Sequence, residues 1–173
     1  MNDTIKTLVE RRSIRKFKSG QITDAQLDEI LKAGKYAASG MGAQSPVLIA
    51  VQDKATIKKL SGMNAAVMGV KSDPFYGAPT VIVVVADRNR MTCVEDGALA
   101  IGNMMNAAWS LGVDSCWIHR AREEFDSPEG KALLREWGIE GDYIGVGHCV
   151  LGYRDCECPV AKPRKEGYAV KIK

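Results

Sequence analysis

Apolar residues at helical spacing predict two helices near the start of the chain. The first covers residues 4–12, and the polar run 2–4 (NDT) offers its N-cap. The sequence 23–26 (TDAQ) has the form of a capping box, and the apolar stripe behind it predicts a second helix that ends near residue 38. Two helices therefore precede any strand, which is not how a doubly wound domain usually begins.

Four apolar runs predict strands over residues 47–51, 81–86, 113–118 and 143–151. The run 81–86 (VIVVVA) is apolar at every position and mostly β-branched, which is typical of a strand buried on both faces. The run 47–51 also predicts a short buried strand.

Helical patterns separate these strands. We expect one or two short helices within residues 54–69, and a long helix over 92–111 that opens with a second capping box (TCVE). Ser127-Pro128 predicts the start of a helix that runs to residue 137, with proline at its first position. This alternation favours an α/β or α+β fold with a small central sheet.

Two segments lack a regular pattern. Residues 39–46 (SGMGAQSP) combine two glycines and a proline, which predicts a loop whose backbone can approach a ligand closely. The tail after residue 152 is rich in charge and proline and has no core pattern of its own. Such a tail is either disordered or laid against another surface.

Composition narrows the class of protein. The chain has 173 residues, of which 46% are hydrophobic and 26% charged, close to the average of a soluble globular protein, so we expect one domain over 1–173. A net charge of +3 is too weak to indicate nucleic acid. The longest apolar run is far shorter than the roughly 20 residues of a membrane span. Charged first turns and an odd number of cysteines, five, favour a reducing cytoplasm without a signal peptide.

A metal centre is the weaker alternative. The candidate ligands match none of the zinc spacings, since the CEC sequence at 156–158 is too short for the usual two-residue gap. Those candidates are Cys116, His119, His148, Cys149, Cys156 and Cys158.

The basic stretch 11–15 (RRSIR) carries most of the chemical information. Guanidinium forks and a serine hydroxyl suit a phosphate, although a solvated basic helix end would have the same composition. A second basic cluster, 162–165 (KPRK), strengthens the phosphate interpretation only if the tail returns to the first cluster.

Five segments, in this order, resemble the FMN-dependent nitroreductases over essentially the whole chain. They are RRSIR at 11–15, the loop 38–46, DPFYGAP at 73–79, the run 112–118 (GVDSCWI), and VLGY at 150–153 followed by KPRK. The chain departs from the family in the loop. Gly42 stands where the family has asparagine, and Ser45 separates Gln44 from its proline.

The resemblance implies a nitroreductase-like α+β fold, in which helices flank a central mixed β-sheet. It also implies a homodimer with FMN at the subunit interface, the long helix 92–111 in that interface, and the C-terminal tail extended over the partner.

The resemblance also implies roles for particular residues. Arg11, Arg12, Ser13 and Arg15 would hold the FMN phosphate and ribityl chain, and Lys162 and Arg164 would contribute to the same phosphate. Gly42 and Gln44 belong to the loop that meets the flavin, Gln44 from the partner subunit. Asn64 would bind the pyrimidine edge, with a helix cap or turn as the alternative. Trp117 and Ile118 would lie near the reactive ring nitrogen, with a core role as the alternative for Trp117.

The implied activity is oxidoreduction. NADH or NADPH would pass a hydride to FMN, and a small nitroaromatic or quinone would then take the electrons. No side chain is implied as acid, base, nucleophile or metal ligand, and no nucleic acid or membrane partner is expected. A non-catalytic flavin-binding or interaction protein on the same fold is the alternative, and the substrate itself stays open.

Overall fold

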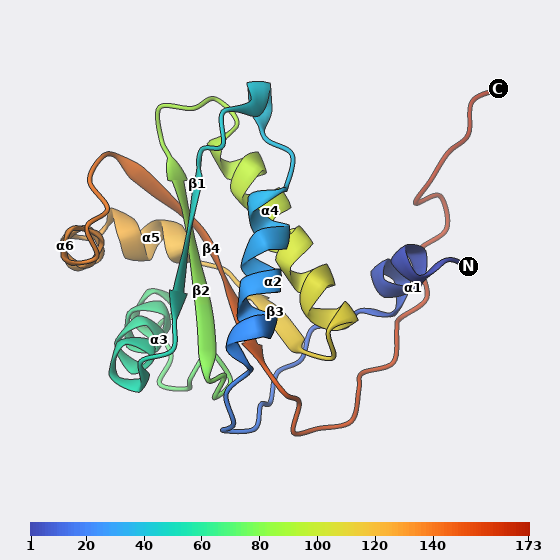
Figure 1. The fold of residues 1–173 in the computed structure, drawn as a ribbon, viewed down its shortest axis with the longest axis horizontal. Coiled ribbons are helices and arrows are strands. Elements are labelled where there is room, and N and C mark those ends of the chain that lie inside the picture. Colours follow the sequence, from blue (N-terminus) through green and yellow to red (C-terminus); the bar gives the residue numbers. More distant parts are fainter.

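Four strands form one sheet in the computed structural model, which describes residues 1–173 (Figure 1). They are β1 (Pro46–Val51), β2 (Thr80–Asp87), β3 (Asp114–Ile118) and β4 (Tyr143–Gly152), in the order β1-β2-β4-β3. Every ladder is antiparallel, where a mixed sheet was expected. Parallel pairing is limited to a single bridge between Ser13 and Ser115, because the segment after the first helix touches the sheet edge only briefly.

Six α-helices and one 3-10 turn complete the fold. They are α1 (Asp3–Glu10), α2 (Asp24–Lys35), η1 (Gly40–Gly42), α3 (Lys54–Met68), α4 (Cys93–Ser110), α5 (Ala121–Asp126) and α6 (Pro128–Glu136). The pattern of the sequence did not predict α5, which is too short at six residues to show a helical period. Among these helices, none combines the length and the apolar character that a bilayer crossing requires.

The helix caps agree with the sequence in three of four places. The Asn2 side chain accepts the Ile5 N–H at the start of α1. Thr23 and Gln26 form the predicted capping box, and the Ser127 hydroxyl accepts a hydrogen bond from the Gly130 N–H at the start of α6. The capping box predicted at 92–95 is wrong, because the Thr92 side chain makes no cap bond. Its hydroxyl instead lies so close to Gly40 that a Cβ on that glycine would come within 2.2 Å.

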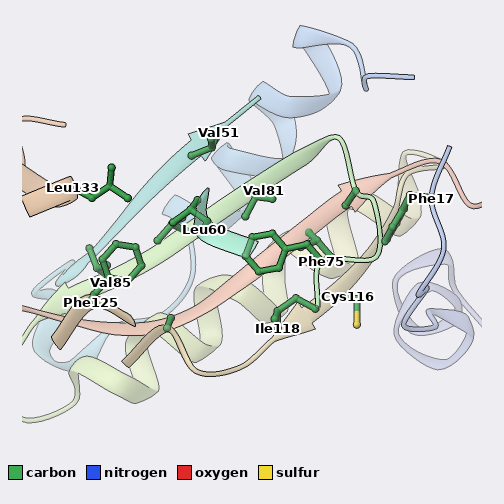
Figure 2. Packing of buried hydrophobic residues seen from close by; sticks show 14 of the residues in the cluster. Phe17, Val51, Leu60, Phe75, Val81, Val85, Cys116, Ile118, Phe125 and Leu133 are labelled. Carbon is green, nitrogen blue, oxygen red and sulfur yellow. The ribbon is translucent and has the colours of Figure 1, made fainter. Parts of the chain in front are cut away.

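The sheet lies between two helical layers. Helices α2 and α4 cover one face, and α3, α5 and α6 cover the other (Figure 1). On the second face, Leu60, Phe75 and Phe125 pack beside the valines of β2 (Figure 2). The interior of β2 is fully buried, which confirms the prediction of a strand covered on both faces. The prediction of burial is wrong for β1, because this strand lies at the edge of the sheet and only Val51 is buried.

A bulge in β4 brings α5 onto the sheet. Val84 pairs with Gly147 and Val85 with Gly145, which leaves Val146 unpaired. Gly145 then faces the start of α5 so closely that a Cβ would lie 2.0 Å from the Ala121 carbonyl oxygen. Glycine is therefore required at this contact, and the loop between β3 and α5 is held against the sheet.

The tail begins beside the basic segment that precedes α2. The Lys18 N–H donates to the Tyr153 carbonyl at 2.8 Å, and the Asp155 N–H donates to the Lys16 carbonyl at 3.0 Å. Beyond Tyr153 every residue is exposed, and no helix or strand follows β4. The absence of a core pattern in the tail is confirmed.

Candidate functional site

Residues 11–15 cross from α1 to the edge of the sheet beside β3. Ser13 pairs with Ser115, and the Ile14 N–H donates to the Ser115 carbonyl at 3.0 Å. Ile14 is fully buried in the core. The backbone of the basic stretch is therefore fixed, and its polar side chains are presented at one place.

Three side chains of this stretch act on the thiol of Cys116. Burial raises the pKa of Cys116, while the positive charge of Arg15, a hydrogen bond with Ser13 and the charge of Arg11 lower it in part. Two guanidinium charges and one hydroxyl of RRSIR therefore act on the same part of β3.

Two polar atoms near this part of β3 are buried without a partner. They are Nη1 of Arg11 and the hydroxyl of Ser115. An unpaired buried guanidinium nitrogen is costly, and a phosphate oxygen would supply the acceptor that it lacks. The residues present here fit a phosphate group. We call Arg11, Ser13, Arg15 and Ser115 the basic cluster.

Arg12 does not join the basic cluster. Its Nη1 donates to the carbonyl oxygens of Val9 and Arg11, each at 2.7 Å. These carbonyls lie at the C-terminal end of α1, where the backbone has no helical partner. Arg12 therefore stabilises the end of the helix in this structure.

Lys162 and Arg164 are not brought to the basic cluster either. Both are exposed in the tail, and neither forms a salt bridge or hydrogen bond with residues 11–15. The tail starts beside residues 16–18, so it leaves the fold next to the cluster. Within one chain, no salt bridge or hydrogen bond joins the two basic regions.

The loop 39–46 is held down by one buried carboxylate on α4. Asp96 accepts the Gly40 N–H at 2.8 Å and the Ser45 hydroxyl at 2.9 Å. Burial opposes ionisation of Asp96, but these two bonds and a third from Thr92 outweigh it, so the pKa of Asp96 is lowered. The loop is thus fixed by an ionised side chain.

The predicted loop residues lie at the surface in left-handed conformations. Gly42 has φ +66, and Gln44 has φ +51 although it carries a side chain. Gln44 lines a hollow of about 220 Å³ between α2, β1 and α4, to which Asp96 and Lys35 also contribute. The loop can offer Gln44 to a molecule outside its own fold.

Asn64 lies in the interior, away from the basic cluster. Its side chain is fully buried and its amide nitrogen donates to the His119 carbonyl at 2.7 Å and to the Glu124 carboxylate. Its amide oxygen accepts from Nε of Arg120 at 3.3 Å. The alternative of a helix cap is wrong, because Asn64 lies within α3 and joins it to α5.

A buried contact between a histidine and a carboxyl group continues this network. Nε2 of His148 lies 3.3 Å from a Glu124 oxygen, and both side chains are fully buried. The rings of Phe75 and Phe125 flank His148, with centroids 5.1 Å and 6.2 Å away. The network ties β4, α3 and α5 together behind the end of β3.

Trp117 and Ile118 turn their side chains into the two cores. Trp117 packs on the α4 side, where a Cβ on Gly147 would meet its indole nitrogen at 2.8 Å. Ile118 is buried on the opposite face, where Figure 2 shows it with Cys116. Only the backbone at this end of β3 faces outward, together with His119, which is exposed, and Arg120, which is partly buried.

The cysteine and histidine candidates for a metal site are scattered. No three His, Cys, Asp or Glu side chains form a group that could hold a metal ion. Cys156 and Cys158 are exposed in the tail, while Cys116 and Cys149 are buried in the sheet. The metalloprotein alternative has no centre in this geometry.

Sequence reasoning missed three residues of this region. Ser115 joins the basic cluster only through its pairing with Ser13, and Asp96 meets the loop only in the folded chain. Arg120 was missed because its left-handed conformation, φ 76, carries no sequence signal of its own. Only the position of Asp96 one turn after Thr92 hinted at a contact near the start of α4.

The comparison with a family model matches the Nitroreductase family over residues 8–69 and 64–153. A protein of Archaeoglobus fulgidus, named for NADH dehydrogenase and NAD(P)H nitroreductase activity, is 33% identical over 159 residues, which cover 88% of this chain and 86% of that protein. The FMN reductase [NAD(P)H] of Bacillus subtilis is 28% identical over 144 residues, and the match covers 70% of this chain and 56% of the longer relative.

Among solved structures, a Bacteroides fragilis nitroreductase with bound FMN superposes with a TM-score of 0.92. It is 29% identical to this chain, and the match covers 100% of both chains.

Proposed function

Because the chain belongs to the Nitroreductase family, we propose that it is an NAD(P)H-dependent flavin oxidoreductase with FMN as its cofactor. One observation of the structure carries the cofactor assignment. The basic cluster gathers two guanidinium groups and two hydroxyls, and it leaves Nη1 of Arg11 buried without an acceptor. A phosphate monoester supplies that acceptor and the negative charge that the two arginines lack.

Each residue of the basic cluster has a distinct task toward the phosphate. Arg11 and Arg15 supply charge, and Ser13 and Ser115 supply hydroxyl donors. Lys162 and Arg164 complete the site once the tail is laid against a surface, since more than one cation suits a doubly charged phosphate. In this arrangement Arg12 keeps its hydrogen bond to the Val9 carbonyl at the end of α1.

FMN, when bound, accepts a hydride from a reduced nicotinamide and returns the electrons to an oxidant. The chain's own residues bind the cofactor and orient it. Trp117 and Ile118 fill the cores on either side of β3, so the strand end would contact the flavin through its backbone. The loop held by Asp96 presents Gln44 of the partner subunit to the ring, and Gly42 leaves room there. No side chain is needed as acid, base or nucleophile.

The proposal also names a class of electron acceptor. A small, flat nitroaromatic or quinone would suit a site built on a strand end and an open loop. Binding without turnover is the alternative, and steady oxidation of NADH or NADPH in the presence of an acceptor separates the two.

A second copy of the chain is the proposed partner. Apolar side chains stay exposed on three neighbouring helices, including Leu8 on α1 and Leu99 on α4, with Tyr36 at the end of α2. A groove of about 600 Å³ runs between these helices. A homodimer would cover this surface and bring loop, tail and basic cluster of two chains together. A cytoplasmic location stays an expectation from the cysteine content.

The test is the affinity for FMN, measured by quenching of flavin fluorescence on the stripped protein. We expect Arg11→Ala and Arg15→Ala each to raise the Kd by about 10- to 100-fold, since a hydrogen bond to a charged group is worth about 1.5–3 kcal/mol. The control is Arg135→Ala, an exposed arginine on α6. Equal Kd values in all four proteins would refute the phosphate site.

A further inference from the structure

Arg120 stands at the junction of β3 and α5 in a conformation that glycine adopts more easily. Its φ is 76, in the left-handed region, and the residue is partly buried. It follows directly after the exposed His119, just beyond the end of the strand. The guanidinium group is therefore held at an open edge of the fold by a strained backbone.

The stem of this guanidinium is fixed from the inside. Its Nε donates to the Asn64 amide oxygen at 3.3 Å. Asn64 is itself immobile, because it is fully buried and its amide nitrogen donates to the His119 carbonyl and to Glu124. The buried pair of Glu124 with His148 closes the network behind it. The interior thus orients Arg120 through one of its three nitrogens.

The other two guanidinium nitrogens have no acidic partner. Arg88, Arg90 and Arg154 each form a salt bridge within the chain, whereas Arg120 forms none. One oxygen of the Glu124 carboxylate accepts from Asn64, and the other lies 3.3 Å from Nε2 of His148 without a hydrogen bond, so neither forms a salt bridge with Arg120. An oriented, partly desolvated guanidinium with two free donors is suited to a planar carboxylate.

We propose that Arg120 selects electron acceptors that carry a carboxylate group beside the part that is reduced. The inference rests on the proposed function, which places the reactive ring at the end of β3 next to Arg120. The two free nitrogens bind the carboxylate of the acceptor, while Asn64 keeps the guanidinium in the plane that this contact requires. Neutral acceptors reach the same site without this contact.

Binding is tested first, without turnover. Oxidised, FMN-loaded protein is titrated with benzoate and with benzamide, a neutral molecule of the same shape, and the change in flavin absorbance gives each Kd. We expect wild type to prefer benzoate, and Arg120→Gly to lose that preference by about tenfold or more. Arg120→Gly should fold, because glycine relieves the left-handed strain.

Turnover is tested with 4-nitrobenzoate and 4-nitrobenzamide. We expect the ratio of their kcat/KM values to fall about tenfold in Arg120→Gly and to be partly retained in Arg120→Lys, which keeps the charge. The control is Arg122→Ala, an exposed arginine two positions further along α5, which should leave the ratio unchanged.

Two results overturn the proposal. One is an unchanged preference for the carboxylate in Arg120→Gly, in both titration and turnover. The other is a changed preference between NADPH and NADH with an unchanged acceptor ratio, which would assign Arg120 to the phosphate of the electron donor. If wild type oxidises NADH or NADPH with neither of these acceptors nor with a quinone, the proposed function fails and this inference fails with it. If wild type reduces the neutral acceptor but shows no preference for the carboxylate, only the inference about Arg120 fails.

Discussion

Replacing Asp96 by alanine should release the loop 39–46 from α4. The carboxylate is 3% exposed and accepts hydrogen bonds from Gly40 at 2.8 Å and from Ser45 at 2.9 Å. In Asp96→Ala the Ser45 hydroxyl stays buried without its acceptor. The loop also keeps its left-handed residues, Gln44 among them, with only the hydrogen bonds within the loop and one to β2 to hold them.

The expected loss of stability follows from these two bonds. A hydrogen bond to a charged group contributes about 1.5–3 kcal/mol, and removal of the buried charge returns part of its desolvation cost. We therefore expect a loss of about 2–4 kcal/mol in the free energy of unfolding. Asp96→Asn keeps an acceptor for Gly40 and a donor for Ser45, so it should lose only about 1 kcal/mol.

Urea unfolding followed by circular dichroism measures both variants, at one protein concentration, since self-association would shift the midpoint. A fall in midpoint with an unchanged m-value would indicate a loss of stability and not a change in compactness. Limited proteolysis locates the effect, because a released loop should be cleaved within 39–46 before the rest of the chain.

The pH dependence gives a second check on the same carboxylate. Its pKa in the folded chain is lowered from 3.8, so its contribution is present above pH 3.8 and is lost as the pH falls through the folded value. The gap between wild type and Asp96→Asn should therefore close below pH 3.8. A stability loss below 0.5 kcal/mol in Asp96→Ala, or a gap that persists in acid, would refute the reasoning.

Three further predictions concern the frame around the site. Gly145→Ala should destabilise the protein by about 3 kcal/mol or more, because the new Cβ would lie 2.0 Å from a backbone oxygen. The control Gly62→Ala, in open space on α3, should stabilise it by about 0.5–1 kcal/mol. Comparable thermal midpoints of the two variants would contradict this. Burial raises the pKa of Cys149 from 9.0 to about 12, so its contribution to stability is complete below pH 9 and should decline above it by about 1.4 kcal/mol per pH unit. Urea titrations at pH 8–10 should show a shallower decline in Cys149→Ala than in wild type. Glu124→Leu should cost about 1–3 kcal/mol, because the buried Asn64 amide loses its carboxylate acceptor, and the double variant with His148→Phe should cost less than the sum of the two single changes.

Local patterns predicted most of the elements of this chain. The continuous β-branched run of β2 indicated a central strand, and its interior is fully buried. The TDAQ sequence set the start of α2, and Ser127-Pro128 set the start of α6. These signals are readable because capping and hydrophobic periodicity act between residues close in sequence.

Where the sequence failed, a distant contact had taken over a local group. Thr92 has the residue type of a helix cap, but its hydroxyl bonds to Asp96 one turn later and lies against Gly40 of the distant loop. Asn64 has the residue type of a ligand-binding amide, but its amide is used up by Glu124 and Arg120 of a later helix and turn.

The sequence by itself determined most of the helices and strands, the family, and the basic residues that suit a phosphate. Only the tertiary structure decided which of these residues meet. Pairing of Ser13 with Ser115 gathers Arg11 and Arg15 at one point, while Arg12 turns back to its helix. It also decided that Arg120 keeps two nitrogens free. Such contacts join residues far apart along the chain, so no local spacing encodes them. They depend on where the packed sheet and helices bring each backbone segment.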